Sequence, residues 1–358
     1  MEIQNKIDTI KKRLKEIYKR DHPPECEPYL DVIKKINAVL ENEDDEIRPR
    51  CPSGFPGGII YLKHNIPTII VPDIHARMDF FLNILLYQDS EGITTLQKLD
   101  LNKIQIVCVG DGLHSEKRSA KRWNDSFSEF TDDYSRHTNI DEEMKEGFGV
   151  MEMIMGVKTA FPLNFHFLKG NHENISNEEG EGNHPFIKFS YEGPMVAYYV
   201  KKFYGEDFLN HYYSFEKNLP IFAVGKNFLI SHSEPQRFYD TEEIIDYKNH
   251  PEVIEGLTWT DDDNAMDGSV LQMITKYLPP EMQEKSYYFG GHRPIFDLYQ
   301  SRAEGKYIKI HNPNKFIIAY IKENEDINLD EDIFEIENKI EEAISEEGKP
   351  DLPVDDKE

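Results

Sequence analysis

The sequence predicts a mixed α/β fold of the α+β type, and two of its features lead to that conclusion. Between residues 59 and 322, short apolar runs alternate with longer segments that are polar or have helical spacing. Such alternation is typical of strands separated by other elements in one mixed domain. In addition, five of the apolar runs end in Asp, Asn or His residues. This shared ending predicts a metal site at the ends of the strands.

Length and composition fit a globular chain without a membrane segment. With 358 residues, of which 39% are hydrophobic, the chain can form one large domain with extensions or two ordinary domains. No apolar run approaches the ~20 residues that cross a bilayer, and residues 1–20 lack the apolar stretch of a secretory signal. The spacing of Cys26, Cys51 and Cys108 matches neither a disulfide framework nor a zinc knuckle. We therefore expect a cytoplasmic protein with reduced thiols.

The net charge of −26 argues against two classes of partner. Non-specific binding to nucleic acid or to an anionic membrane needs a positive surface. The negative charge is concentrated, because residues 323–358 hold sixteen acidic residues against three lysines, which is half of the excess. We expect neither nucleic acid nor membrane partners, and the sequence leaves the oligomeric state open.

Residues 1–50 are predicted to form a helical extension. Five aliphatic residues alternate spacings of four and three on one helical face: Ile3, Ile7, Ile10, Leu14 and Ile17. Residues 29–40 show a second helical pattern. Packing of the first helix on its own domain is favoured over a dimer contact, because two heptads are too few for a coiled coil. The turn-rich segment CPSGFPGG then marks a boundary near residue 50.

The domain predicted for residues 51–322 contains eight strands. In chain order these are the runs IIYL, TIIV, IQIVCV, FHFL, IFAV, NFLI, YYFG and FIIAYI. The segments MDFFLNILLY and NHYYSFEKNLP have helical spacing. Beyond residue 322, one helical stripe is formed by Ile333, Ile336, Ile340 and Ile344. Residues 323–358 are therefore expected to form an acidic C-terminal helix and a disordered tail.

The polar strand ends lie in TIIVPDIH, IQIVCVGD, FHFLKGNHE, NFLISH and YYFGGH. One Asp or His after a strand means little, because both are common turn or surface residues. Five strands with the same ending are a stronger signal. Asp73 and His75 stand two residues apart, so in an extended chain they point to the same side and can reach one ion together. Gly110 lets the backbone turn sharply before Asp111.

Mixed ligation by Asp, Asn and His indicates a particular chemistry. It suits Mn²⁺, Fe or Zn²⁺ better than Ca²⁺ or a metal that prefers thiolates. Two such ions about 3.5–4 Å apart can share a hydroxide and can neutralise the attacking and leaving oxygens of a phosphoryl group. The sequence therefore predicts a phosphoester hydrolase with a dinuclear site of two divalent transition-metal ions, with Mn²⁺ as first choice.

The ordered motifs PDIH, GDGLH, GNHEN, SHSEP and GGHRP resemble those of the calcineurin-like metallophosphoesterases, and within them the phosphoprotein phosphatase branch. The segments FYGEDFLNHYYSFEKNLPIFAVGKNFLISH and LTWTD are also similar to segments of that branch. The resemblance covers about residues 59–322 and implies a central β-sandwich flanked by helices. It also implies roles for single residues. The first metal is bound by Asp73 and His75, Asp111 bridges, the second metal is bound by Asn171, His232 and His292, and His172 is the general acid.

The chain departs from the pattern of that branch in the motif GDGLH. His114 stands where an aspartate that orients the general acid is expected, and Ser115 stands where a phosphate-binding arginine is expected. Three places are open for His114: beside His172, near the phosphate, or facing solvent. The substrate-binding candidates are Arg77, Arg237, Arg293 and His114, although a solvated surface residue is the simpler interpretation of each of the three arginines. Residues 115–149 are interpreted as an inserted lid or recognition loop.

The favoured function is a Ser/Thr phosphoprotein phosphatase that acts on a phosphorylated protein or a small phosphoester. The alternative is a nucleotide or dinucleoside-polyphosphate hydrolase, because relatives with the same motifs catalyse that reaction. A non-catalytic scaffold with this fold is the third possibility. Retention of all six implied ligand residues disfavours the scaffold.

Overall fold

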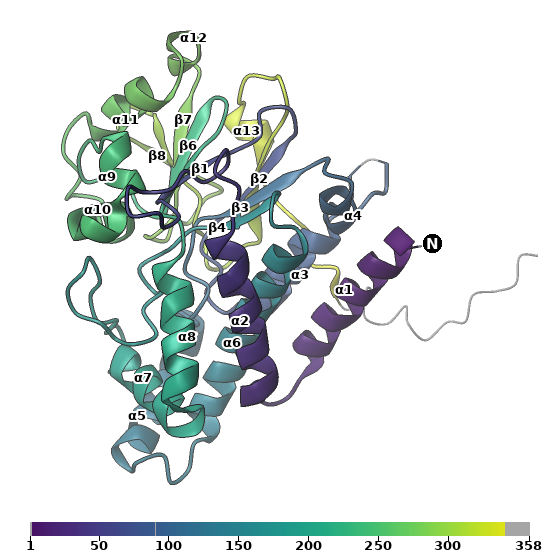
Figure 1. The fold of residues 1–358 in the computed structure, drawn as a ribbon, viewed down its shortest axis with the longest axis vertical. Coiled ribbons are helices and arrows are strands. Elements are labelled where there is room, and N and C mark those ends of the chain that lie inside the picture. Colours follow the sequence, from purple (N-terminus) through teal and green to yellow (C-terminus); the bar gives the residue numbers. More distant parts are fainter. Residues whose placement is uncertain (1, 90, 341–358) are drawn as a thin grey trace, which may run out of the picture.

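Two β-sheets packed face to face form the centre of the molecule (Figure 1). The computed structural model describes residues 2–89 and 91–340. One sheet has the strand order β1-β5-β6-β7-β9-β8, and the other has the order β11-β10-β2-β3-β4. The strands are β1 (Ile59–Tyr61), β2 (Thr68–Val71), β3 (Gln105–Cys108), β4 (Phe165–Phe167), β5 (Phe222–Val224), β6 (Phe228–Ser231), β7 (Tyr287–Gly290), β8 (Gln300–Arg302), β9 (Tyr307–Lys309), β10 (Ile317–Ile321) and β11 (Ile333–Glu335).

Both faces of each sheet are covered, which explains why the strands are almost continuously apolar. Ile70 of β2 and Val107 of β3 belong to the core between the two sheets. Their neighbours Ile69 and Ile106 point to the opposite side, into a larger core shared with helices. This alternation follows from the two-residue period of a strand. All eight predicted strands are confirmed, whereas β8, β9 and β11 were not predicted.

Helices cover the outer faces of the sandwich in two groups (Figure 1). The group on the five-stranded sheet contains α1 (Glu2–Lys19), α2 (Cys26–Glu41), α3 (Met78–Leu86), α4 (Thr95–Asp100), α5 (Ala120–Thr131), α6 (Thr138–Ala160), α7 (Glu192–Phe203) and α8 (Gly205–Lys217). The group on the six-stranded sheet contains α9 (Thr241–Ile245), α10 (Pro251–Thr258) and α11 (Ser269–Tyr277). The short helices η1 (Lys117–Ser119), η2 (Tyr247–Asn249), α12 (Pro280–Gln283) and α13 (Leu329–Asp332) lie in connections.

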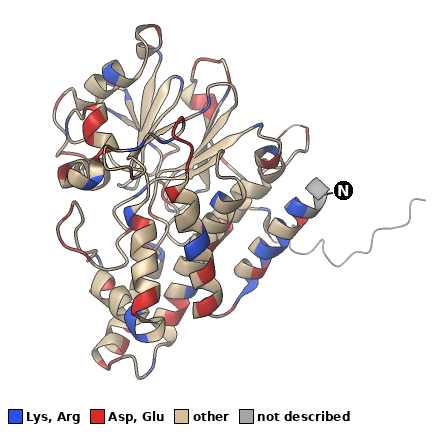
Figure 2. Cartoon of the chain, viewed as in Figure 1, with Lys and Arg blue, Asp and Glu red and all other residues tan. Residues whose placement is uncertain are grey.

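The N-terminal helices pack on the domain of their own chain, as the sequence predicted. Ile7, Leu14 and Ile17 are buried in the core beside the five-stranded sheet. Helix α1 is rich in Lys and Arg (Figure 2), and Arg13 and Arg20 both pair with the buried carboxylate of Glu152 on α6. The side chains of α1 are therefore anchored by apolar packing and by charge.

The segment 115–149 is helical, which corrects the prediction of an inserted loop. It comprises η1, α5 and the first half of α6. Ile140, Met144 and Phe148 of α6 are buried in the large core, as is Trp123 of α5. The many charged and aromatic residues suggested a lid. In the structure, however, apolar residues of both helices are buried against the large core.

The C-terminal prediction is also corrected. Ile333–Glu335 form β11, which pairs antiparallel with β10 and extends the five-stranded sheet. Ile333, Ile336 and Ile340 are buried. Ile333 is buried because β11 pairs with β10, and not because it belongs to a helical stripe. Ile344 and the predicted tail lie outside the described part of the chain. The spacing suggested a helix because three residues are too few to reveal a strand period.

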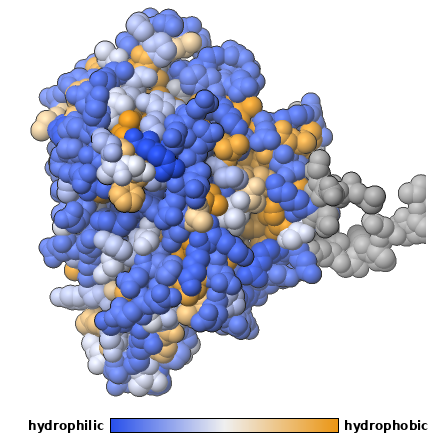
Figure 3. All heavy atoms as spheres, viewed as in Figure 1, coloured by the Kyte–Doolittle hydropathy of each residue, from blue (hydrophilic) through white to orange (hydrophobic). Residues whose placement is uncertain are grey.

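The face of the molecule in Figure 3 is mainly hydrophilic, with small scattered apolar areas. None of the helices in residues 2–89 and 91–340 combines the length and the apolar composition of a membrane span.

Candidate metal centre

Five strands deliver their polar ends to one place in the structure. β2, β3 and β4 are parallel neighbours in one sheet, and β6 and β7 are parallel neighbours in the other. Residues that follow the carboxyl ends of parallel strands meet at one edge. All six predicted ligand residues, Asp73, His75, Asp111, Asn171, His232 and His292, are buried there.

One carboxylate oxygen lies at the centre of the cluster. The Oδ2 atom of Asp111 is 3.7 Å from Nε2 of His75 and 3.4 Å from Nε2 of His232. These two histidines were predicted to bind different ions. The position of Asp111 between them is the arrangement that a bridging carboxylate requires.

The residues predicted for each ion form two subgroups. On one side, Nε2 of His75 lies 3.8 Å from Oδ2 of Asp73. On the other side, Oδ1 of Asn171 lies 2.9 Å from Nε2 of His232 and 3.1 Å from Nδ1 of His292. Ligand atoms bound to one transition-metal ion at about 2.1 Å are separated by similar distances.

Hydrogen bonds behind the cluster fix how the histidine rings face it. Nδ1 of His75 donates to the carbonyl oxygen of His114 at 3.0 Å, and Nδ1 of His232 donates to that of Val109 at 3.1 Å. Because a carbonyl oxygen only accepts, each Nε2 carries a lone pair that points to Asp111. Support of this kind orients the ligands of metal sites in many proteins.

The donor set fits divalent cations. Buried atoms without a hydrogen-bond partner include Oδ1 of Asp73 and Nε2 of His75. Burial, followed by the nearby carboxylates of Asp111 and Glu116, raises the pKa of Asp73 well above its usual range. Burial also raises the pKa of Asp111 to about 8. Each of these buried carboxylates accepts one backbone N–H, from His292 and His172 respectively, and otherwise faces lone pairs. Such an environment is unfavourable without positive charge, and two divalent cations would supply it.

The backbone of the site is held in conformations that are rare for residues other than glycine. The φ angles are 47° at His75, 53° at Asp111 and 64° at His292. Left-handed backbone at such residues is concentrated at functional sites. Gly110 has φ 118°, and a Cβ there would overlap the backbone nitrogen of Gly170, so the predicted need for glycine is confirmed.

Glu173 connects two of the strand-end loops. Its carboxylate accepts hydrogen bonds from the backbone N–H groups of Gly170, Asp111 and Gly112 at 2.7, 2.9 and 2.8 Å. Asp111 in turn accepts from the backbone N–H of His172 through Oδ1. These bonds hold the bridging carboxylate and the predicted general acid in one rigid unit. No role in the site was predicted for Glu173.

His114 lies beside His172, in the first of the three places left open. Their ring centroids are 5.2 Å apart, but no hydrogen bond joins the rings, and Nδ1 of each is buried without a partner. Phe186 packs on both rings, with its centroid 3.8 Å from that of His172. Burial lowers the pKa of His114 to about 3 and that of His172 well below its usual value. Nothing in the described chain orients His172 as a carboxylate would.

The three candidate arginines differ in their surroundings. Arg77 is buried and donates to four backbone carbonyls, among them that of Asp73, so its guanidinium supports the site from behind. A contact of Arg77 with substrate stays a prediction. Arg237 pairs with Glu243 of α9 at 2.8 Å and lies over the ring of Tyr239. Its guanidinium is therefore engaged by residues in and next to α9.

Arg293 is the arginine that is placed at the mouth of the site. It follows His292, has a side chain that is 45% exposed, and pairs with Asp261. Oδ1 of Asp261 lies 3.6 Å from Nε2 of His292.

Three further residues of the site were missed by the sequence analysis. His311 follows β9, and its Nδ1 lies 3.8 Å from Oδ2 of Asp73. Glu116 lies 3.7 Å from Nε2 of His75 and 3.4 Å from Nε2 of His311. The ammonium group of Lys188 pairs with Glu116 at 2.5 Å. The segment YIKIH, which ends in histidine but is interrupted by Lys309, was the available signal for His311.

Comparison with solved structures identifies the fold. A protein serine/threonine phosphatase from Saccharomyces cerevisiae superposes with a TM-score of 0.54 over 87% of this chain and 89% of its own, at 12% sequence identity. The chain has the calcineurin-like metallophosphoesterase fold. A cold-active protein-tyrosine phosphatase from a psychrophilic Shewanella is less similar, with a TM-score of 0.37, 14% identity and coverage of 78% of this chain and 80% of the other. No family model and no curated protein sequence matches the chain.

Proposed function

We propose that the chain is a metal-dependent phosphatase that hydrolyses phosphomonoesters, with phosphoserine or phosphothreonine in proteins as the substrate. The observation that carries this proposal is the set of buried Asp, Asn and His residues around Oδ2 of Asp111. Their lone pairs converge in a space lined by strand ends. The completeness of the set argues against a non-catalytic scaffold.

The residues divide into two proposed ion sites. Asp73 and His75 would hold one ion, Asn171, His232 and His292 would hold the other, and Asp111 would contact both. Divalent ions in these sites would neutralise phosphoryl charge and lower the pKa of bound water. Mn²⁺ is the first choice, and Fe or Zn²⁺ also suits a mixed carboxylate and imidazole set.

His172 is the proposed proton donor to the leaving oxygen. Its Nε2 lies 3.8 Å from Oδ2 of Asp111, so the ring borders the same space as the ligands. A general acid is most effective when a partner fixes its tautomer and stabilises its protonated form. Because His114 offers no carboxylate for that purpose, we expect weak acid catalysis and a preference for substrates with good leaving groups.

The phosphate would be bound by cationic side chains outside the segment GDGLHS, in which Ser115 stands where an arginine is expected. Arg293 and Lys188 are the candidates, because both border the cluster and both have partly exposed side chains. Each pairs with a carboxylate, Asp261 and Glu116 respectively, so binding of phosphate would compete with an existing ion pair.

The test is hydrolysis of three substrates by the Mn²⁺-loaded protein. We would compare p-nitrophenyl phosphate, a phosphoserine peptide and a dinucleoside tetraphosphate, with Asp111→Asn as the control. Turnover of the peptide at a higher kcat/KM than the tetraphosphate supports the proposal. A higher kcat/KM for the tetraphosphate would favour a dinucleoside-polyphosphate hydrolase over a protein phosphatase. Absence of turnover with all three substrates would refute the proposal that the chain is a phosphatase.

The same assay tests the acid step. In the wild type we expect a much higher kcat/KM for p-nitrophenyl phosphate than for the phosphoserine peptide. His114→Asp should lower the ratio of these two values, because it places a carboxylate beside His172. An unchanged ratio would show that position 114 has no orienting role.

A further inference from the structure

His311 shares the edge at which the proposed ligands meet. β9 pairs with β7 in parallel register, with Lys309 opposite Gly290. His311 follows Lys309 by two residues, as His292 follows Gly290. The two histidines therefore occupy equivalent positions after neighbouring parallel strands. This is the arrangement that brings the other proposed ligands together.

The surroundings of His311 repeat those of the proposed ligand histidines. Nε2 of His311 donates to Oε2 of Glu116 at 3.4 Å, and because a carboxylate accepts, the other ring nitrogen carries the lone pair. That atom, Nδ1, is fully buried, has no hydrogen-bond partner and lies 3.8 Å from Oδ2 of Asp73. His75 and His232 show a similar division, with one nitrogen bonded to a backbone carbonyl oxygen and the other facing the carboxylates. The partner of His311 is instead a carboxylate that borders the site, because Glu116 also lies 3.7 Å from Nε2 of His75.

Distances allow His311 to share an ion with the first subgroup. Ligand atoms of Asp73, His75 and His311 all lie within 4.8 Å of one another. The ring centroids of His75 and His311 are 5.2 Å apart. A lone pair buried in this position has an unfavourable environment unless a cation is close to it.

We infer that His311 is a protein ligand of the first metal ion, bound through Nδ1, and that Glu116 positions its ring. This inference rests on the proposed metal-dependent function and adds a residue to that site. Asp73, His75, Asp111 and His311 would give the first ion two carboxylates and two imidazoles. A set with two imidazoles favours Zn²⁺ or Fe over Mn²⁺ more than a set with one.

Lys188 completes the group. Its ammonium pairs with Oε1 of Glu116 at 2.5 Å, while Oε2 faces His311. Glu116 is buried and also lies near His75. Carboxylate–histidine pairs of this type raise the basicity of a metal ligand and fix its tautomer, and their loss typically weakens metal binding about 10- to 100-fold.

The test is calorimetric titration of the metal-free full-length protein with Zn²⁺ and with Mn²⁺. In the wild type we expect two sites. In His311→Ala we expect one of them to weaken by at least about 10-fold, and more for Zn²⁺ than for Mn²⁺. Glu116→Gln should weaken the same site by a smaller factor. His166→Ala removes a buried histidine of β4 that contacts Lys158 and not the cluster, and it should leave both affinities unchanged.

Two conservative variants separate a ligand from a structural residue. The amide of His311→Asn reaches about as far as Nδ1, whereas that of His311→Gln reaches about as far as Nε2. We expect the Asn variant to bind the first ion more tightly than the Gln variant. Circular dichroism and thermal unfolding of the metal-free variants would establish that they are folded.

The outcomes distinguish the inference from the function on which it rests. Absence of metal binding in the wild type would refute both. Two sites of wild-type affinity in His311→Ala would overturn the inference alone. If that variant does not fold, a Gln variant that binds the first ion at least as tightly as the Asn variant would overturn it.

Discussion

Substitution of Asp111 by Asn should have opposite effects on the metal-free and the metal-loaded protein. Without metal, Oδ2 of Asp111 faces the lone pairs of His75 and His232. Burial raises the pKa of this carboxyl to about 8, compared with about 3.9 for an unfolded chain. An amide at this position carries no charge, and its NH₂ group can donate to the histidine nitrogens.

The magnitude follows from that pKa difference. A carboxyl whose pKa is raised by folding favours the folded state below about pH 4 and opposes it progressively as the pH rises towards the folded pKa. At pH 7 the penalty reaches at most about 4 kcal/mol, from about 1.4 kcal/mol per pKa unit. The contribution of Asp111 to the free energy of unfolding of the metal-free wild type should therefore fall between pH 4 and pH 8. Because the other groups are common to both proteins, the stability of Asp111→Asn relative to the wild type should rise over this range, and the variant should be the more stable protein at pH 7.

Urea unfolding followed by circular dichroism, in EDTA and in Mn²⁺, measures both effects. Ions at a hundred times their Kd should stabilise the wild type by about 2.7 kcal/mol per site, and Asp111→Asn should lose most of this gain. The matched control is Asp45→Asn, because Asp45 pairs with Arg50 on the surface and should contribute less than about 1 kcal/mol. An Asp111→Asn protein that is less stable than the wild type in EDTA at pH 7, or that gains as much from Mn²⁺, would refute the reasoning.

The remaining predictions concern the surroundings of the site. In Gly291→Ala, the added Cβ would overlap Oδ1 of Asp73, so metal content measured by elemental analysis should fall while the fold is kept; full metal content would show that the carboxylate can move away. Burial of Glu43 raises the pKa of its carboxyl, but the nearby cations Lys158 and Arg48 outweigh this effect and lower that pKa to about 2. This carboxylate therefore stabilises the fold above about pH 4.3 and loses that effect as the pH falls towards 2. Glu43→Gln should cost about 3 kcal/mol at pH 7 in urea unfolding with metal content unchanged, and equal stability would contradict the buried ion pair. Ile333→Ala, in the fully buried part of β11, should cost about 2–4 kcal/mol, whereas a loss below about 0.5 kcal/mol would show that β11 is not part of the core.

Much of the candidate site could be predicted from the sequence because the residues that meet there follow apolar runs. Asp73, Asp111 and His232 each follow, within about three residues, a strand that is buried on both faces, and such strands leave a clear signal. Register then brings the strand ends together without information from distant residues. The motifs therefore predicted which residues meet at this edge, and their division between two ions stays a prediction.

Other features depend on tertiary contacts that a sequence does not display. β9 is three residues long and includes Lys309, which is buried against Asp262. The strand therefore lacks a continuous apolar pattern and was not predicted. His311, which follows it, was missed for the same reason. The sequence predicts a substrate contact or a surface position for Arg77, because nothing in it indicates that four carbonyl oxygens would surround the guanidinium. β11 forms because β10 offers an edge for pairing.

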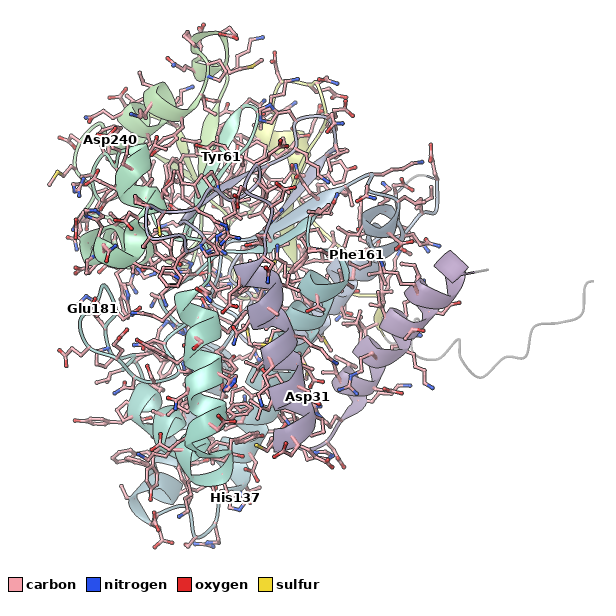
Figure 4. All side chains as sticks on the ribbon, viewed as in Figure 1. Asp31, Tyr61, His137, Phe161, Glu181 and Asp240 are labelled. Carbon is pink, nitrogen blue, oxygen red and sulfur yellow. The ribbon has the colours of Figure 1, made fainter. Side chains whose placement is uncertain are left out.

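The loop between β4 and α7 shows a third limit. Glu181 marks it in Figure 4, where it extends at the side of the molecule. Gly182 of this loop approaches α10, and Glu178 bonds to residues of α8. These contacts hold the loop so that Phe186 reaches His172 and Lys188 reaches Glu116. The segment has neither helical nor strand periodicity, so its part in the site was not foreseen.

The most direct test of the central claim combines metal titration with turnover on one sample. Metal-free wild-type protein would be titrated with Mn²⁺ by calorimetry, and hydrolysis of p-nitrophenyl phosphate would be measured after each addition. We predict that two equivalents bind and that activity rises as the second site fills. Binding of less than one equivalent by folded protein, or activity that does not depend on added metal, would contradict the account.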